Sequence, residues 1–191
     1  ARKHPLSVGQ PLANDAAGAL RRARPGDAFI VFSRRDALNL RDDLLALGKS
    51  VACIYGALSP EVREREAHRF AGGDADILVA TDAIGMGLNL PIRRVLFSTL
   101  TKYDGVGDRE LSVSEVHQIA GRAGRYGMHD EGFVSVLKEA EADALKTLRA
   151  EVEARQSWVR GAAVVGVVAP WIVLGLLVLR PEGVAAYATG A

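Results

Sequence analysis

Short apolar runs alternate with amphipathic segments along most of the chain, and this alternation limits the folds open to it. Leu40, Leu44 and Leu47 recur at helical spacing between two such runs, and Gly48 stops the pattern. Strands that alternate with helices predict crossover units, and therefore an α/β fold with a mostly parallel sheet and helices on both faces. Five runs have the length and composition of buried strands: 28–32, 51–55, 77–80, 95–98 and 133–137.

The ends of these predicted strands carry polar side chains. In an open parallel sheet, ligands bind beyond the carboxyl ends of the strands, so we expect Ser33, Tyr55 and Thr81 at the functional edge. The segment 81–91, TDAIGMGLNLP, combines Thr81 and Asn89 with glycines that permit close backbone approach, which suits phosphate or sugar oxygens. An ordinary strand-to-helix loop with turn glycines is the alternative.

Composition excludes several classes of site. The 24 basic and 23 acidic residues give a net charge of +1, so any contact with a polyanion has to be local. Cys53 is the single cysteine and lies in an apolar run, which excludes an internal disulfide and fits a reducing compartment. The four histidines lack ligand spacing to one another or to Cys53, so a metal site is not expected.

The segment 114–127, SEVHQIAGRAGRYG, is the strongest candidate for chemistry. Gln118 lies four residues before Arg122 and seven before Arg125, which brings one amide and two guanidinium groups near one helical face. Guanidinium groups grip phosphate oxygens bidentately and keep their charge. Gly121 and Gly124 would let a bulky partner approach the backbone. A solvated basic helix end beside a glycine-rich cap is the alternative.

Four motifs taken in order carry a resemblance to a known family. Motifs IV, IVa, V and VI of superfamily 2 helicases resemble, in this order, the segments IVFSRRD, IYGALSPEVR, ATDAIGMGLNLPIRRVLFSTL and SEVHQIAGRAGRYG. The sequences of these segments are most similar to those of mitochondrial RNA-degradosome helicases and their bacterial relatives. The resemblance covers roughly residues 1–148 and implies a second RecA-like domain, the half of an ATP-dependent RNA helicase that closes over ATP and contacts RNA. The competing interpretation is a non-catalytic RecA-like binding module or fusion fragment tethered to a membrane.

The resemblance also implies roles for individual residues. Catalysis falls to two arginine fingers on the γ-phosphate and to a glutamine that orients the phosphate or the attacking water: Arg122, Arg125 and Gln118. Two residues would line the nucleotide cleft near the ribose: Gly87 and Asn89, where related helicases often have aspartate. Five residues would follow the nucleic-acid backbone: Ser33, Arg34, Tyr55, Gly56 and Thr81.

ATP and Mg²⁺ are the implied cofactors, but this sequence lacks the elements that hold them. The only GKS, residues 48–50, follows a helix, and Asp43 occupies the glycine position that a phosphate-binding loop requires. Neither Asp82 nor the Asp130–Glu131 pair forms a convincing metal-binding acidic motif. We therefore expect the missing first RecA-like domain to hold Mg²⁺, and we expect no ATP turnover by this chain alone.

The two ends of the chain differ in composition from the middle. Residues 1–27 carry three prolines among polar residues, which is typical of a connector, and 28–148 would be the helicase domain. Residues 149–191 would form a hydrophobic helical tail whose uncharged segment 161–179 approaches the length of a membrane span. The tail resembles the membrane part of type II secretion F-family proteins of the tight-adherence kind. More arginines before than after that segment predict that the helicase-like part lies in the cytoplasm. Together with the resemblance to bacterial proteins, this gives the expectation of a bacterial cytoplasmic location with possible membrane contact through the tail.

Overall fold

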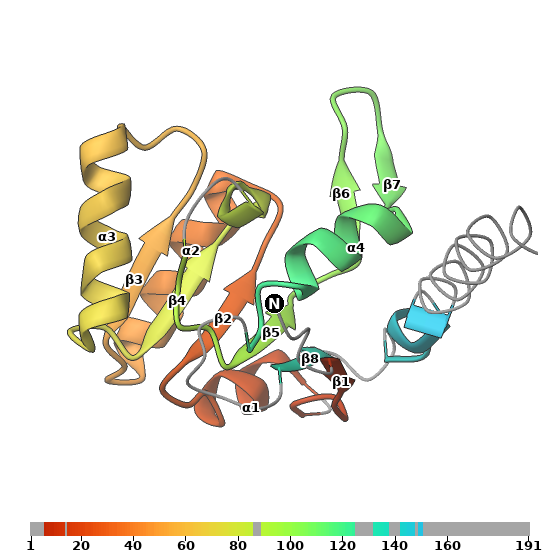
Figure 1. The fold of residues 1–191 in the computed structure, drawn as a ribbon, viewed down its shortest axis with the longest axis horizontal. Coiled ribbons are helices and arrows are strands. Elements are labelled where there is room, and N and C mark those ends of the chain that lie inside the picture. Colours follow the sequence, from red (N-terminus) through yellow and green to blue (C-terminus); the bar gives the residue numbers. More distant parts are fainter. Residues whose placement is uncertain are drawn as a thin grey trace, which may run out of the picture. The chain divides into compact units, whose positions relative to one another are not determined.

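A six-stranded parallel sheet forms the centre of the fold (Figure 1). The computed structural model describes residues 6–13, 15–85, 89–124, 132–137, 142–147 and 149–150. Across the sheet the strand order is β1-β8-β5-β2-β4-β3. Their bounds are β1 Leu6–Val8, β8 Gly132–Val136, β5 Arg94–Phe97, β2 Asp27–Ile30, β4 Ile77–Ala80 and β3 Val51–Ile54. All five strands that the apolar runs predict are therefore present, and the α/β class is confirmed.

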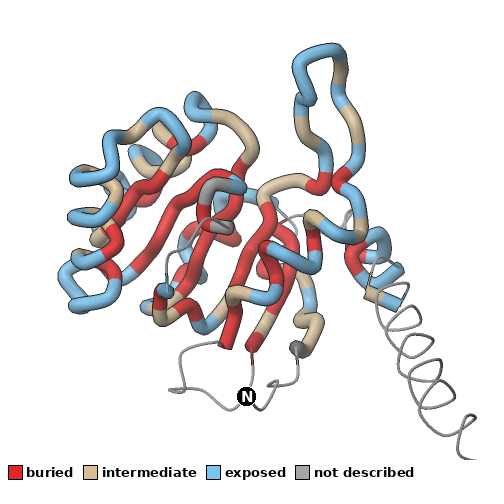
Figure 2. Tube along the Cα trace, turned by 45° about the horizontal axis from the view of Figure 1, so that its top comes forward, coloured by how far each residue is buried: buried red, intermediate tan, exposed pale blue. Residues whose placement is uncertain are grey.

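Successive side chains of each strand point to opposite sides of the sheet, so both faces carry apolar side chains. Helices cover both faces. One buried cluster joins alternate strand residues to α1 (Ala16–Arg21) and α2 (Arg34–Ala46). The other joins the intervening residues to α3 (Pro60–Gly72), the short 3-10 helix η1 (Asp82–Gly85) and α4 (Val113–Ala120). Figure 2 shows the strands as the buried centre between these helices. Strands buried on both faces explain the continuous apolar runs in the sequence.

Short polar side chains fix where the helices begin. Ser33 caps α2 by accepting a hydrogen bond from Asp36 N at 3.0 Å, and Ser59 caps α3 with Pro60 in its first turn. Ser112 and Glu115 form a reciprocal capping box at α4. Serine at the helix start, followed by a proline or by an acidic residue three positions on, is a pattern that marks these starts in the sequence, and it holds the residues that follow each strand in defined places.

Two elements depart from the predicted pattern. β1 lies in the segment assigned to a connector, yet it pairs in parallel with β8 from Leu6↔Gly132 to Val8↔Val134. An antiparallel hairpin, β6 (Thr101–Tyr103) and β7 (Asp108–Glu110), projects between β5 and α4. The hairpin escaped prediction because its strands are three residues long and mostly charged.

Apart from residues 149–150, the predicted tail lies outside the described residues, and so does all of its apolar segment 161–179. Among the helices that are described, none combines the length and the hydropathy needed to cross a membrane. The boundaries 1–27, 28–148 and 149–191 remain predictions.

Candidate functional site

The carboxyl ends of β2, β3 and β4 lie side by side and present the residues singled out from the sequence. Ser33 follows β2, Tyr55 and Gly56 follow β3, and Thr81 follows β4. The Thr81 N–H donates to Ile54 O at 3.0 Å, which ties the ends of β4 and β3 together. The structure thus assembles side chains from separate motifs at one edge of the sheet, as the parallel topology requires.

Arg34 and Tyr55 form the outer part of this edge. The Arg34 guanidinium carbon lies 5.4 Å from the centre of the Tyr55 ring, within the range of a cation–π contact. The Gly56 carbonyl accepts from Arg63 Nη2 at 3.1 Å, and a side chain at Gly56 would meet open space. Thr81 is 7 % exposed, so its side chain is less accessible than the motif suggests. Arg34 and Gly56 are the exposed members of this group.

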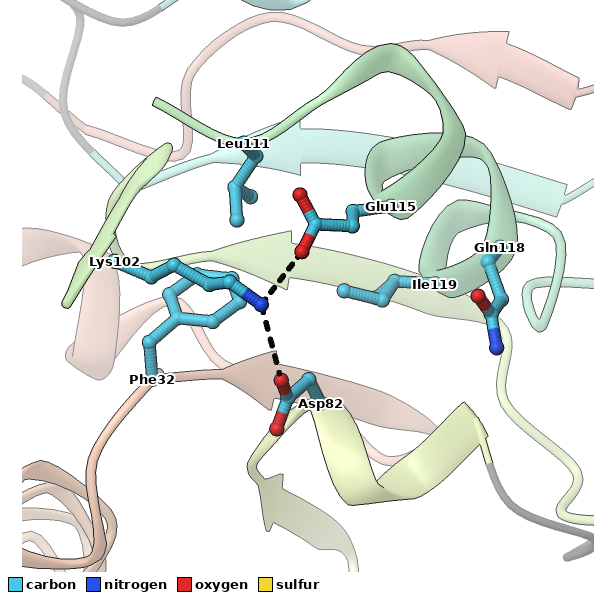
Figure 3. Close-up of a pocket in the computed structure, with 7 residues that line it drawn as sticks. All are labelled: Phe32, Asp82, Lys102, Leu111, Glu115, Gln118 and Ile119. Atoms are coloured by element: carbon cyan, nitrogen blue, oxygen red, sulfur yellow. Dashed lines mark ion pairs between the residues drawn. The ribbon is translucent and has the colours of Figure 1, made fainter. Parts of the chain in front are cut away.

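A small pocket lies between the edge of the sheet and α4 (Figure 3). Its volume is about 160 Å³, and its lining residues come from the segment after β2, η1, the hairpin with the residue that follows it, and α4. The lining residues are Phe32, Asp82, Lys102, Leu111, Glu115, Gln118 and Ile119. Of the predicted catalytic residues, Gln118 therefore lies at this pocket, where it is exposed, and Asp82 of the TDAIG motif lines the same pocket.

Lys102 is the central charge of the pocket, and no motif pointed to it. Its Nζ lies 2.5 Å from Glu115 Oε1 and 3.6 Å from Asp82 Oδ2 (Figure 3). The side chain is 19 % exposed, so these contacts are partly shielded from water. Lys102 thereby links the hairpin both to η1 and to the helix that carries Gln118.

Glu115 binds a second cation of the hairpin. Arg109 donates to both carboxylate oxygens of Glu115 at 2.9 Å, a bidentate pair. Ser112 N and Ser112 Oγ each donate to Oε2 at 2.9 Å. The hydrogen-bonded Arg109 holds the pKa of Glu115 well below its usual range. Partial burial of the carboxyl group opposes this shift, and Lys102 and Ser112 add to it. Glu115 is therefore an ionised anchor between the hairpin and α4.

The glycines after α4 serve the fold itself. Gly124 has φ +69°, a left-handed conformation that favours glycine, and its N–H donates to Ile92 O at 2.9 Å. A side chain at Gly121 would stand 2.9 Å from His117 O. These internal requirements account for both glycines without a bound partner, and they fix the backbone around half-buried Arg122.

The remaining predicted residues are placed as follows. Asn89 is exposed. Arg125 and Gly87 lie outside the described residues. Within the described ranges, no group of three or more His, Cys, Asp or Glu residues could hold a metal ion.

Sequence reasoning missed Lys102, Arg109 and Glu115 as a group. One signal was available, because Asp104-Gly105 is a turn dipeptide and a hairpin would have been expected around it. Sequence spacing alone identifies Glu115 only as the partner of Ser112 in a capping box. Its pairing with both hairpin cations depends on the three-dimensional position of the hairpin.

Comparison with protein families gives a match over residues 13–127 to the family described as helicase conserved C-terminal domain. The "ATP-dependent RNA helicase SUV3, mitochondrial" of Candida albicans is 43 % identical over 148 residues, covering 73 % of this chain and 21 % of that protein. The "DExH-box ATP-dependent RNA helicase DExH16, mitochondrial" of Arabidopsis thaliana is 51 % identical over 106 residues, covering 54 % of this chain and 19 % of that protein. The chain thus spans about one fifth of the length of these relatives.

Solved structures support the fold. The C-terminal domain of the DEAD-box protein Dbp5 matches with a TM-score of 0.57 at 17 % identity, over 78 % of this chain and 84 % of that chain. At this identity the likeness concerns the architecture alone, and it agrees with a RecA-like sheet flanked by helices.

The expected bacterial cytoplasmic location is contradicted by these comparisons. The relatives named above are eukaryotic and are described as mitochondrial. The expectation depended on arginines around the segment 161–179, which carry an orientation signal only if that segment spans a membrane. The resemblance of the tail to secretion F-family proteins is likewise unsupported, as is contact with a membrane.

Proposed function

Because the chain belongs to the helicase C-terminal domain family, we propose that it acts as the C-terminal motor half of an ATP-dependent RNA helicase. The observation that supports this proposal is the position of Gln118 at a pocket that is also lined by Phe32 and Asp82, the chain neighbours of Ser33 and Thr81 at the strand ends. Gln118 and Arg122 suit a phosphate group, whereas the residues at the strand ends, Ser33, Tyr55 and Thr81, suit a nucleic-acid backbone. A motor needs the phosphate-facing and the RNA-facing residues in one rigid domain, so that a change at the first set alters the second.

Arg122 and Arg125 would act on the transferred phosphoryl group. Phosphoryl transfer is catalysed mainly by positioning and by stabilising charge, and an arginine finger supplies about 10³- to 10⁵-fold in rate. Gln118 would orient the phosphate or the attacking water from the exposed side of α4. Asn89 and Gly87 would line the same cleft near the ribose.

RNA would follow the outer edge of the sheet. Arg34, stacked on Tyr55, offers a guanidinium group to a phosphate, and Ser33, Gly56 and Thr81 lie along the same line of strand ends. With a net charge of +1, the binding would depend on these few contacts and would weaken as salt is raised.

ATP and Mg²⁺ would be shared with a first RecA-like domain. By the family resemblance, Mg²⁺ would be held by that domain. This chain would contribute the arginines and the glutamine on domain closure. Alone, it would not hydrolyse ATP.

A chimera tests the proposal. Residues 6–150 replace the corresponding region of the Candida albicans relative, and RNA-stimulated ATP hydrolysis is measured. Arg122→Lys and Arg125→Lys keep the charge but lose the bidentate fork, so kcat should fall by about 100-fold with a smaller change in RNA affinity.

Two further variants separate the roles. Arg34→Ala should weaken RNA binding first, whereas Arg65→Lys, on the exposed side of α3, is the control and should leave both properties unchanged. If the substitutions at 122 and 125 abolished RNA binding but left turnover near that of the parent chimera, the assignment of α4 to the phosphate would be wrong.

A further inference from the structure

A second depression lies on the other face of the sheet, away from the pocket that contains Gln118. Its volume is about 440 Å³, and it is lined by Pro11, Leu12 and four arginines. We call it the arginine depression, defined by Arg21, Arg22, Arg24 and Arg94. Arg94 opens β5 and lies two residues before Leu96, which packs with α1 and α2, so its side chain belongs to that face. The arginine depression shares no lining residue with the Gln118 pocket.

Two of the four guanidinium groups are held in place by the fold. Arg94 donates through Nε and Nη2 to Asp27 at 2.8 and 2.6 Å, and Asp27 is 1 % exposed. Arg22 Nη1 donates to Leu12 O at 2.9 Å, which leaves its other N–H groups available. Such anchoring means that a ligand would not have to order these long side chains.

The other two guanidinium groups keep their donors. Arg21 and Arg24 are exposed, and the described part of the chain offers their side chains no hydrogen bond or ion pair. Lys49 adds a further positive charge at the rim, where its Nζ donates to Ala23 O at 3.2 Å. Within the described residues, Asp27 is the only carboxylate paired with a lining arginine.

A basic residue in the last turn of a helix is common, because it faces the negative end of the helix dipole. That effect explains Arg21 at the end of α1, but it does not explain Arg94, which comes from a strand, or Arg24, which lies beyond the helix. Their convergence on one hollow leaves an excess of positive charge that an anion would neutralise.

The size and chemistry of the hollow indicate the kind of anion. A volume of 440 Å³ lies in the range of small-molecule sites, about 300–1,000 Å³. Guanidinium groups from a helix end, the loop after it and a strand suit an anion with several phosphate groups. The forks of Arg21 and Arg24 can each grip two oxygens, whereas Arg94 keeps only its Nη1 group beyond the pair with Asp27. A nucleic-acid strand would instead require charges strung along a groove. We propose that the arginine depression binds a small anion carrying two or more phosphate groups.

Titration of the 191-residue chain with inorganic tripolyphosphate, followed by isothermal calorimetry, tests this proposal. We expect saturable binding of one tripolyphosphate per chain, and at least ten-fold weaker binding of orthophosphate. The double variant Arg21→Gln/Arg24→Gln should weaken tripolyphosphate binding at least ten-fold. The matched control Arg65→Gln/Lys146→Gln removes the same charge from exposed positions elsewhere and should bind within two-fold of wild type.

Three results of the tripolyphosphate titrations would overturn the proposal. The first is an absence of saturable binding by a chain whose circular dichroism shows it to be folded. The second is equal weakening by the test and control variants, which would indicate a general charge effect. The third is binding that survives Arg21→Gln/Arg24→Gln and disappears in Arg122→Gln, which would place the anion at the proposed motor site.

A short single-stranded RNA provides the remaining comparison. Its affinity should be the same for wild type and Arg21→Gln/Arg24→Gln, because the proposed RNA contacts lie at the strand ends. A ten-fold loss of RNA affinity in this variant would make the surface part of a nucleic-acid path and would overturn the proposal. Since the arginine depression does not contain Gln118 or Arg122, failure here would leave the proposed motor function untouched.

Discussion

Lys102 Nζ lies 2.5 Å from Glu115 Oε1, and this contact joins the β6–β7 hairpin to the helix that carries Gln118. The same ammonium group lies 3.6 Å from Asp82 Oδ2, in the turn after β4. Three segments that are separate in sequence therefore share one partly shielded charge. Removing this charge should loosen the proposed phosphate-facing helix α4 as well as the hairpin.

Lys102→Met should lower the stability of the chain by about 1 kcal/mol, because it keeps the aliphatic stem but removes a half-buried charge with two partners. In thermal denaturation, Tm should fall by about 2–4 °C. Lys146→Met is the matched control, since Lys146 is 54 % exposed and pairs only with Asp143 at 3.3 Å. Equal shifts in the two variants would show that the shielding of Lys102 contributes nothing.

Glu115 should make stability depend on pH. Arg109 holds the pKa of Glu115 below its unfolded value of about 4.5, so its contribution is full above that pH and is lost as pH falls toward the folded pKa. Glu115→Gln should cost about 2 kcal/mol in urea denaturation at pH 7, by weakening the Arg109 pair and the capping box. The difference from wild type should shrink steadily below about pH 4.5. A difference that stayed constant down to pH 3 would contradict the lowered pKa.

Gly132→Ala should destabilise the chain by about 2 kcal/mol or more. A Cβ at this position would stand 2.6 Å from Ala123 O, and neither β8 nor the segment after α4 can move without breaking backbone hydrogen bonds. Gly72→Ala is the control, because α3 has open space there and alanine favours a helix. Urea denaturation should show a loss for the first variant and no loss for the second. Similar midpoints would mean that β8 and Ala123 can separate at little cost.

The single cysteine should react slowly in the folded chain. Burial raises the pKa of Cys53 to about 11, and the residue is 6 % exposed. The thiolate is the reactive form, so at pH 8 a thiol reagent should label the native chain at least about 100-fold more slowly than the chain in urea. Comparable rates in the two conditions would show that the edge of the sheet at β3 opens readily.

The regular part of the fold could be predicted from the sequence. Strands buried on both faces leave uninterrupted apolar runs, and Ser33, Ser59 and Ser112 mark helix starts through a local interaction that sequence spacing records. β1 could not be predicted in this way, because a three-residue strand has too few side chains to show a pattern. Its place depends on β8, which is remote in sequence.

The candidate site was predictable where function follows the strand ends and unpredictable where it depends on the hairpin. The position of Ser33, Tyr55 and Thr81 follows from parallel topology alone. Lys102 and Glu115 meet because a charged hairpin folds back over α4, and no periodicity in the sequence encodes that contact. The sequence suggested that Gly121 and Gly124 let a bound partner approach. Backbone geometry within the chain is already enough to explain both glycines.

The pairing of β1 with β8 has a consequence for the order of folding. Ser135 Oγ donates to Gln10 O at 2.6 Å across 125 residues of sequence, so this edge of the sheet closes a very long loop. Loop closure is an entropic cost that local strand–helix units largely avoid, and distant contacts slow folding. We expect the units from β2 to β4 to assemble early and β1 to dock last. The helix with Gln118 lies inside the closed loop, so the proposed motor site would reach its final form only when the two distant ends of this domain have met.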